Sequence, residues 1–541
     1  MSDQTKSYDF IVCGAGSAGC VLANRLSADP NNRVLLIEAG PRDWNPVFRV
    51  PIMAGRLFMG RYCNWGYSTE PEPHLDGRRI PWPRGKVVGG TSSINGMVYI
   101  RGHAADFDQW AQMGLPSWSY ERVLPYFKRS EGHYRGGDDF HGAGGPQRVG
   151  PPKSKNPIFE AFVQAGIEAG HPFNPDFNGA DQQGVGRYDY TIWRGQRWSA
   201  ARGYLDPARA RPNLTIMTGA RLLKVLLRKG QARGVRVKVG KDVLEIAAER
   251  EVALCLGAIG SPQALMLSGV GDPYALWDLG LKCEVEAPDV GKNLRDHLQV
   301  RVTHESLRPD ETWDLLRADR AAFEFTRTAL IGGGPFGRFP HEGGAFLKSQ
   351  AHVGLPDLQI HFVAGGGGRV RLPFGRGSSP PGAPRGYSFT GSVCHLRPES
   401  SGEVALVSKD PLKAPAIRAN YLASDADRRA LREGVRRVRE IFAQKAFDSF
   451  RGPELFPGPD VSSDAELDRF AAATATTVFH PVGTCRMGAD ETAVVDEKLR
   501  VRGARRLRVV DASIMPRIVG GNTHAATLMI AERAAQMMLE A

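Results

Sequence analysis

The chain has few cysteines and no long apolar run. Seven cysteines are spread over 541 residues without a C-x-x-C pair, so the sequence lacks the usual spacing of a metal or dithiol site. No run of about 18 apolar residues occurs, and the first residues lack the apolar core of a signal peptide. We therefore expect reduced thiols, no metal, no membrane span and a cytoplasmic location, with peripheral contact to the inner membrane left open.

Internal repeats and low-complexity tracts are absent as well, and 42% hydrophobic with 24% charged residues excludes a disordered chain. Glycine is in excess, with 63 residues, and this favours tight turns and close approach of the backbone to a ligand. The formal charge of +12 suits an anionic partner such as a phosphorylated cofactor, lipid or nucleic acid.

The densest basic stretch does not indicate nucleic-acid binding. Its arginines alternate with apolar residues at helical spacing, which is typical of the solvated face of an amphipathic helix. No aromatic residues are interleaved and no nucleic-acid motif accompanies the run. The arginines are Arg428, Arg429, Arg432, Arg436, Arg437 and Arg439.

The N-terminus reads as a βαβ unit. A strand over Tyr8–Cys13 meets the hexapeptide Gly14–Gly19, which fits G-x-G-x-x-G, and a helix over Cys20–Ser27 precedes a strand over Arg33–Ile37. The glycines permit the turn, the approach of a pyrophosphate and close helix packing. Glu38 ends the second strand, where its carboxylate can accept hydrogen bonds from a ribose. The pattern predicts dinucleotide binding and leaves FAD and NAD open.

Further elements follow from alternation. Residues 40–100 suggest extended loops over a ligand. We expect a meander over 214–218, 221–228, 233–239 and 242–247, a strand over 251–256, and antiparallel strands near 343–348, 356–363, 387–397 and 403–408. The glycine- and proline-rich run 365–385 is either a lid over a pocket or a surface excursion.

Five ordered blocks carry a resemblance. The chain resembles the glucose-methanol-choline (GMC) oxidoreductases, and Leu396–Ser400 places it near the choline-dehydrogenase-like members. The blocks are 85–102, 257–271, 289–297, 480–488, and 510–516 followed by 521–523.

The resemblance implies an α/β fold with a discontinuous Rossmann-like FAD-binding domain and a substrate domain built on an antiparallel sheet flanked by helices. The expected cofactor segments are 1–155, 206–310 and 474–541, and the expected substrate segments are 156–205 and 311–473. Some relatives attach FAD through a histidine at the position of Ile94, and isoleucine has no nucleophilic nitrogen, so non-covalent FAD is predicted.

Motif and resemblance together assign the cofactor contacts. These are Gly14, Gly16, Ser17, Ala18, Gly19, Glu38, Ala39, Arg84, Gly89, Gly90, Thr91, Ser92, Asn95, Gly96, Met97, Val98, Asp511 and Ala512.

The resemblance also assigns the chemistry. His480 takes the role of the base that removes the alcohol proton, a task that suits a neutral imidazole, and Asn522 that of its hydrogen-bonding partner. His524 is a local rival that we interpret as structural.

For other residues near these blocks, a functional and a structural interpretation both stay open. Trp65, Val478 and Phe479 are candidates for the substrate pocket, with core packing as the alternative. We do not assign Glu342 to a cationic substrate, and we read Cys394 as a buried thiol, although photodecarboxylases of this fold use a cysteine near the flavin.

We therefore expect an FAD-dependent alcohol dehydrogenase that passes electrons to a quinone or cytochrome, with oxygen as the alternative acceptor. A hydroxynitrile lyase, a fatty-acid photodecarboxylase and a dinucleotide-binding protein without chemistry are the rival functions. The sequence fixes neither the alcohol nor the oligomeric state.

Overall fold

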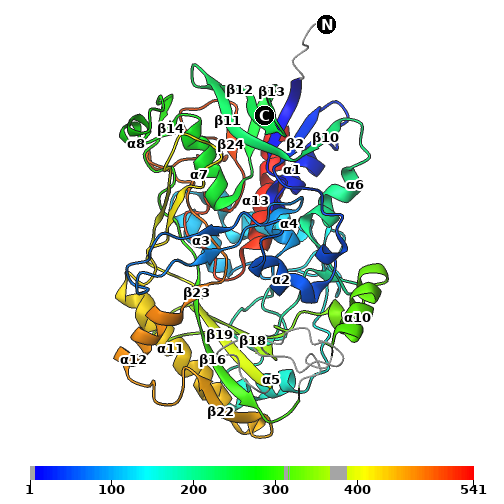
Figure 1. The fold of residues 1–541 in the computed structure, drawn as a ribbon, viewed down its shortest axis with the longest axis vertical. Coiled ribbons are helices and arrows are strands. Elements are labelled where there is room, and N and C mark those ends of the chain that lie inside the picture. Colours follow the sequence, from blue (N-terminus) through cyan, green and yellow to red (C-terminus); the bar gives the residue numbers. More distant parts are fainter. Residues whose placement is uncertain (1–6, 310–314, 316, 366–386) are drawn as a thin grey trace.

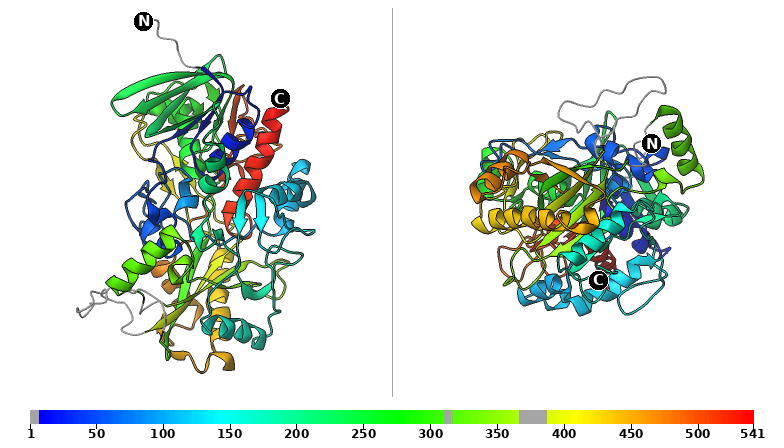
Figure 2. Two further views of the ribbon diagram at one scale, coloured as in Figure 1. Left: turned by 90° about the vertical axis from the view of Figure 1, so that its right-hand side faces the viewer. Right: turned by 90° about the horizontal axis from the view of Figure 1, so that it is seen from below.

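Two seven-stranded sheets organise the chain. The computed structural model describes residues 7–309, 315, 317–365 and 387–541. One sheet lies toward each end of the long axis of the molecule (Figures 1 and 2). Their strands alternate along the sequence, so each sheet gathers segments that are far apart in the chain. This architecture confirms the predicted fold class, while the domain boundaries given above stay predictions.

The first sheet has a parallel centre and an antiparallel side. Strand β1 lies between β2 and β13 and pairs with both in parallel, and its apolar run Phe10–Cys13 is fully buried, as expected for the middle of a covered sheet. In spatial order the strands are β10 (Leu214–Thr218), β2 (Val34–Glu38), β1 (Ser7–Cys13), β13 (Asp242–Leu254), β12 (Gln231–Val239) and β11 (Ala220–Arg228), and β24 (Leu507–Val509) pairs with β13.

The predicted meander was wrong in two respects. Strand β10 pairs in parallel with β2, so the meander begins only at β11. Strand β13 is continuous where two strands were predicted. Its first half alternates because it forms an exposed hairpin with β12, and its last residues are buried between β1 and β24. The change of environment within one strand therefore looked like a break in the sequence.

The second sheet is antiparallel and lies below the first in Figure 1. Helices α5 (Ile158–Glu168) and α11 (Asp425–Phe442) cover one of its faces. In spatial order its strands are β22 (Arg451–Phe456), β16 (Leu298–Ser306), β19 (Ser388–His395), β18 (Leu358–Ala364), β17 (Gly343–Leu347) and β7 (Gly184–Arg187), and β23 (Thr476–Thr477) also pairs with β16.

Two expectations for this region need comment. The strand predicted over 403–408 is shorter, β20 (Glu403–Ala405), and it pairs with β21 (Ala416–Arg418) outside the main sheet. The candidate lid at 365–385 lies outside the described residues except for Gly365.

Helix α11 confirms the reading of the arginine-rich run. Leu431, Val435 and Val438 are buried against the sheet, whereas the arginines form ion pairs on the outer side, such as Arg432 with Asp468 at 2.8 Å and Arg439 with Glu454 at 2.7 Å. Charge on this helix is therefore largely neutralised by neighbouring carboxylates.

The remaining helices surround the first sheet and the junction. Helix α13 packs on α1 and α4, and α1 begins at Ser17, three residues before the predicted start. Among the described residues, no helix is long and apolar enough to cross a membrane. The helices are α1 (Ser17–Leu26), α2 (Ala54–Met59), α3 (Ala104–Gln112), α4 (Tyr120–Ser130), α6 (Asp206–Ala208), α7 (Gly257–Leu267), α8 (Pro273–Asp278), α10 (Ala318–Leu330), α12 (Asp464–Thr474) and α13 (Thr523–Leu539).

Candidate active site

A cavity of about 990 Å³ lies between the two sheets. One part is lined by the glycine segments that follow β1 and by the start of β11, and we call it the cofactor half. The other part is lined by β16, β18 and β19 and by the segment around His480, and we call it the substrate half. The volume of the whole cavity lies at the upper end of the range of cofactor and small-molecule pockets, about 300–1,000 Å³.

The glycine motif forms a cradle in which side chains have no room. Gly14 has φ +101°, and a Cβ there would lie 2.5 Å from the Cys255 carbonyl oxygen. A Cβ on Gly19 would lie 1.8 Å from the Gly14 oxygen, so this glycine serves the packing of α1 on the strand. A Cβ on Gly90 would lie 2.7 Å from the Gly16 Cα. Two glycine loops therefore meet beside the N-terminus of α1, which favours an anionic group.

Two buried carboxylates hold this cradle in shape. Glu38 accepts hydrogen bonds from the Ala15 amide at 3.0 Å and the Gly40 amide at 2.7 Å, and burial raises its pKa to about 7. Asp511 accepts hydrogen bonds from the Gly257 amide at 2.8 Å and the Ser261 hydroxyl at 2.5 Å. Both acids line the cavity. Their carboxylates are therefore bound to the protein itself before any ligand enters.

All the predicted cofactor residues except Gly19 and Gly89 line the cavity. Sequence reasoning missed several others. Residues 220–223 of β11 carry no motif, and only the fold brings them to the cavity. Thr523 and Thr527, on the first turns of α13, follow the predicted Asn522, and helical spacing from that residue was the available signal.

His480 stands at the end of a chain of hydrogen bonds. Its Nδ1 lies 3.1 Å from Nδ1 of His297, whose Nε2 lies 2.9 Å from the Leu396 carbonyl oxygen. A carbonyl only accepts, so a neutral His297 carries its proton on Nε2 and accepts at Nδ1. Nδ1 of His480 must then be the donor. The lone pair of His480 is left on Nε2, which lies 3.1 Å from the Asn522 side-chain nitrogen.

The surroundings keep both imidazoles neutral. Burial lowers the pKa of His297 to about 3. Burial, followed by the potentials of His297, His361 and Arg84, lowers the pKa of His480 well below its usual value. Behind the ring, Asp296 accepts the His480 amide at 2.7 Å and the hydroxyls of Thr477 and Tyr421, which fixes the backbone of the base.

The structure brings Asn522, and not His524, to His480. The Asn522 side-chain oxygen accepts from Gln359 at 3.1 Å, which orients its amide nitrogen toward the base. His524 instead bonds Ser17 through Nδ1 at 3.0 Å, and its buried Nε2 has no partner among the described residues. His524 therefore belongs to the cofactor half, next to the start of α1.

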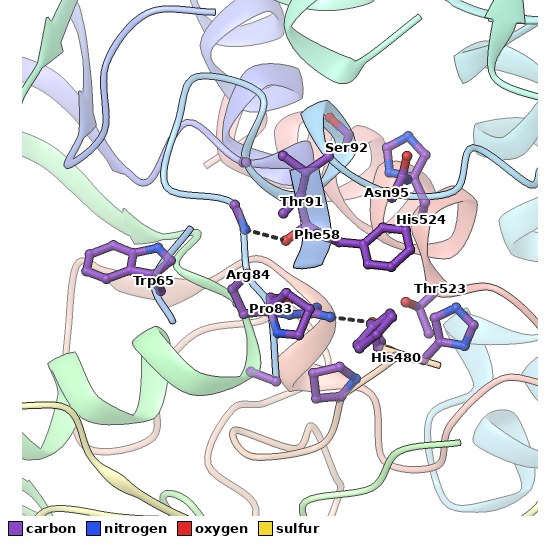
Figure 3. Close-up of a pocket in the computed structure, with 18 of the residues that line it drawn as sticks. Phe58, Trp65, Pro83, Arg84, Thr91, Ser92, Asn95, His480, Thr523 and His524 are labelled. Carbon is purple, nitrogen blue, oxygen red and sulfur yellow. Dashed lines mark hydrogen bonds between the residues drawn. The ribbon is translucent and has the colours of Figure 1, made fainter. Parts of the chain in front are cut away.

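The three predicted pocket residues lie in different places. Val478 and Phe479 line the cavity next to the base, and the Phe479 oxygen accepts from Arg84 at 2.6 Å. Trp65 also lines the cavity but stacks on Tyr67, with Arg84 between it and His480 (Figure 3).

Glu342 and Cys394 do not line the cavity. The Glu342 carboxylate pairs with Arg187 and accepts the Ser154 amide at 2.7 Å, so it does not offer a counter-charge to a ligand. Cys394 is fully buried behind Gln359, and burial raises its pKa to about 12, which agrees with the reading as a plain buried thiol.

Comparison with known proteins agrees with this arrangement. Residues 8–299 and 398–531 match the N- and C-terminal family models of the GMC oxidoreductases. The chain is 44% identical to an oxygen-dependent choline dehydrogenase of Ectopseudomonas mendocina over 98% of its own length and 93% of that protein, and 43% identical to one of Sinorhizobium fredii over 98% and 95%.

Solved structures give the same picture. The structure of pyridoxine 4-oxidase from Mesorbium loti superimposes with a TM-score of 0.88 at 33% identity, covering 99% of this chain and all of that one. A variant formate oxidase of Aspergillus oryzae gives 0.90 at 28%, covering 100% and 99%. The first family model alone spans more than half of the chain, and the protein therefore belongs to the GMC oxidoreductases, FAD-dependent enzymes that oxidise alcohols.

Proposed function

We propose that this enzyme converts an alcohol to its aldehyde or ketone with His480 as the base. The observation that carries the proposal is the lone pair on His480 Nε2, which the bonds to His297 and Leu396 fix and which lies at the cavity. Asn522 contacts the same nitrogen, so a hydroxyl placed there meets one acceptor and one amide donor.

The residues of the cofactor half fit FAD. The glycine cradle and the N-terminus of α1 would receive the pyrophosphate, and Glu38 would receive a ribose. His524 Nε2, buried and without a partner among the described residues, offers one more polar contact on this side. When bound, FAD supplies the acceptor for the hydride.

The protein supplies the path of the proton. Because His480 is neutral, it accepts the hydroxyl proton at Nε2 while the carbinol carbon loses its hydride. Its low pKa makes it a weak base toward an isolated alcohol. Proton transfer is therefore coupled to departure of the hydride, which acidifies the hydroxyl, and the proton is released readily afterwards.

We further propose that FAD is held without a covalent bond. Ile94 is buried at the cavity and offers no nucleophile. Acid precipitation should release all the flavin into the supernatant, whereas colour that stays with the pellet would contradict this.

Choline is the first substrate to test, because the sequence relatives named above are choline dehydrogenases. For the electrons, we propose a quinone or another acceptor, and peroxide formed in equal amount to the product in air would instead identify an oxidase. A cytoplasmic location and contact with a membrane surface stay predictions.

The proposal is tested by titrating the purified yellow protein with choline, benzyl alcohol and a medium-chain alkanol, anaerobically and in the dark. Bleaching of the flavin band supports alcohol oxidation. Flavin that stays oxidised with every alcohol, including those used below, favours a lyase or a light-driven enzyme.

A further inference from the structure

The roof of the substrate half is a polar face of the second sheet. Side chains at alternate positions of a strand share a face. Val300 and Val302 of β16 are buried on the face that α11 covers, and the alternating residues Gln299 and Arg301 are polar and line the cavity. The register aligns the strands in cross-strand rows. Gln299, Cys394 and Gln359 form one row, of which only Gln299 lines the cavity, and Arg301, Ser392 and His361 form the next, all of which line it.

One row of this roof, Arg301, Ser392 and His361, has polar side chains without hydrogen-bond partners in the part of the chain that the structure describes. Arg301 has an exposed side chain that lines the cavity, and this side chain forms no ion pair or hydrogen bond among the described residues. Ser392 is 5% exposed and His361 8%, and neither side chain makes a hydrogen bond within the described part of the chain. All three side chains line the cavity, and a guanidinium without a counter-charge at a ligand cavity points to an anionic ligand.

No carboxylate among the described residues lines the substrate half, since Asp296 lies behind His480 and is bonded to the His480 amide and to two hydroxyls. Among the described residues, the only acids that line the whole cavity are Glu38 and Asp511, which belong to the cofactor half and are bonded to backbone amides. Glu342 is held by Arg187. Arg84, the other cation near the base, donates to the Phe479 carbonyl and adds to the positive potential. This environment repels a quaternary ammonium group and attracts an anion.

We propose that Arg301, Ser392 and His361 bind a carboxylate of the substrate, so that the alcohol oxidised here is a hydroxy acid. The guanidinium would pair with the carboxylate, and the hydroxyl and imidazole N–H would complete its hydrogen bonds. This inference rests on the proposed function, because it assumes that the hydroxyl lies at His480.

The register sets the length of such a substrate. Gln359, which orients Asn522, lies on the row adjacent to that of Arg301. Rows on one face are about 6.6 Å apart, twice the rise per residue of a strand. A spacer of the size of a benzene ring therefore separates hydroxyl and carboxylate, and very short hydroxy acids would not reach both sites.

Three alcohols of one shape test the charge preference: 4-(hydroxymethyl)benzoate, its neutral amide, and benzyl alcohol with a 4-trimethylammonium group. We expect kcat/KM for the benzoate to exceed that for the amide roughly 10- to 100-fold, the range for one charged hydrogen-bonded pair, with the cation slowest. Arg301→Gln should remove this preference, and Arg301→Lys should retain part of it.

The control is Arg233→Gln, which removes the same charge from an exposed position of β12 and should leave the preference intact. Equal kcat/KM for the three alcohols, or an unchanged preference in Arg301→Gln, would overturn the inference while leaving alcohol oxidation in place.

A binding test separates the two proposals. 4-Methylbenzoate has no hydroxyl to oxidise, and we expect it to raise the melting temperature of the holoprotein more than 4-methylbenzamide does, with the difference lost in Arg301→Gln. That result would support the carboxylate site even if no alcohol bleached the flavin. Equal shifts for both ligands would contradict it.

Discussion

The two halves of the cavity are built by different means. The cofactor half consists of backbone: glycines without room for a Cβ, the N-terminus of α1, and the carboxylates of Glu38 and Asp511 bonded to amides. The substrate half consists of side chains that project from strands at every second position. A backbone cradle tolerates almost no substitution, whereas a sheet face accepts new side chains without changing its strands. The same fold therefore keeps one cofactor while the substrate varies.

The largest expected effect lies where the halves meet. His480→Ala removes the proton acceptor, and kcat should fall by roughly 10²- to 10⁴-fold, the contribution of a positioned base. The flavin content should not change, because the hydrogen bonds of His480 to Asp296 and His297 lie on the substrate side and do not hold the glycine cradle. The measurement is the rate of anaerobic flavin bleaching by the best alcohol, and His524→Ala is the matched variant from the cofactor half.

If the flavin of His480→Ala bleached at the rate of the unaltered protein, His480 would play no part in proton transfer. A variant that lost its flavin as well would show that the two halves are not separable at this residue.

The second-largest expected effect tests whether the cofactor half is built from backbone atoms. Gly19→Ala places a Cβ 1.8 Å from the Gly14 oxygen, and overpacking of this kind costs about 1–3 kcal/mol or more. FAD should dissociate at least roughly tenfold more readily, as measured by release of flavin fluorescence on dilution. Gly55→Ala in α2 is the control, since a Cβ there meets nothing within 4 Å. Equal flavin retention in both variants would contradict the claim that FAD binding depends on glycines without room for a Cβ.

The same contrast explains what the sequence revealed. Gly14–Gly19 and Glu38 are close in the chain, and each has a backbone task that only a few residue types perform, so their function was predictable. His480 and Asn522 were predictable through the resemblance, since a histidine alone carries no such signal. The course of β10 and the length of β13 were not, because both depend on which distant strand pairs with them.

The row of polar residues in the roof of the substrate half could not be predicted from the sequence either. Arg301, Ser392 and His361 come from three strands, and β16 and β18 are not neighbours in the sheet order. Nothing in the chain relates these residues until the register aligns them. His297 lies within the block 289–297, but its role in fixing the tautomer of His480 depends on the bond to the Leu396 carbonyl, which the sequence does not show.

A smaller effect concerns that tautomer. His297→Phe keeps an aromatic ring but removes the acceptor for Nδ1 of His480, so the proton of His480 is free to move to Nε2. Loss of one hydrogen bond corresponds to about 0.5–1.5 kcal/mol, and kcat should fall roughly 3- to 10-fold with KM little changed. A structural disturbance would instead raise KM and loosen the flavin, which its fluorescence reports. Unchanged kcat would mean that the chain does not orient the base.

The smallest expected effect is on the pH dependence of stability, to which one buried histidine in each half of the cavity contributes. Burial lowers the pKa of His361, in the substrate half, and of His524, in the cofactor half, to about 4 each. The unfolded chain binds these protons near pH 6.5, so between pH 6.5 and about 4 each histidine lowers the free energy of unfolding by about 1.4 kcal/mol per pH unit as the pH falls. Urea unfolding of the holoprotein from pH 7.5 to 4.5 should show the slope reduced by one proton in His361→Asn and by one in His524→Asn, and unchanged in the exposed His74→Asn. A slope that His361→Asn left unaltered would mean that folding does not lower the pKa of this histidine, because the folded and the unfolded chain would then bind its proton over the same pH range.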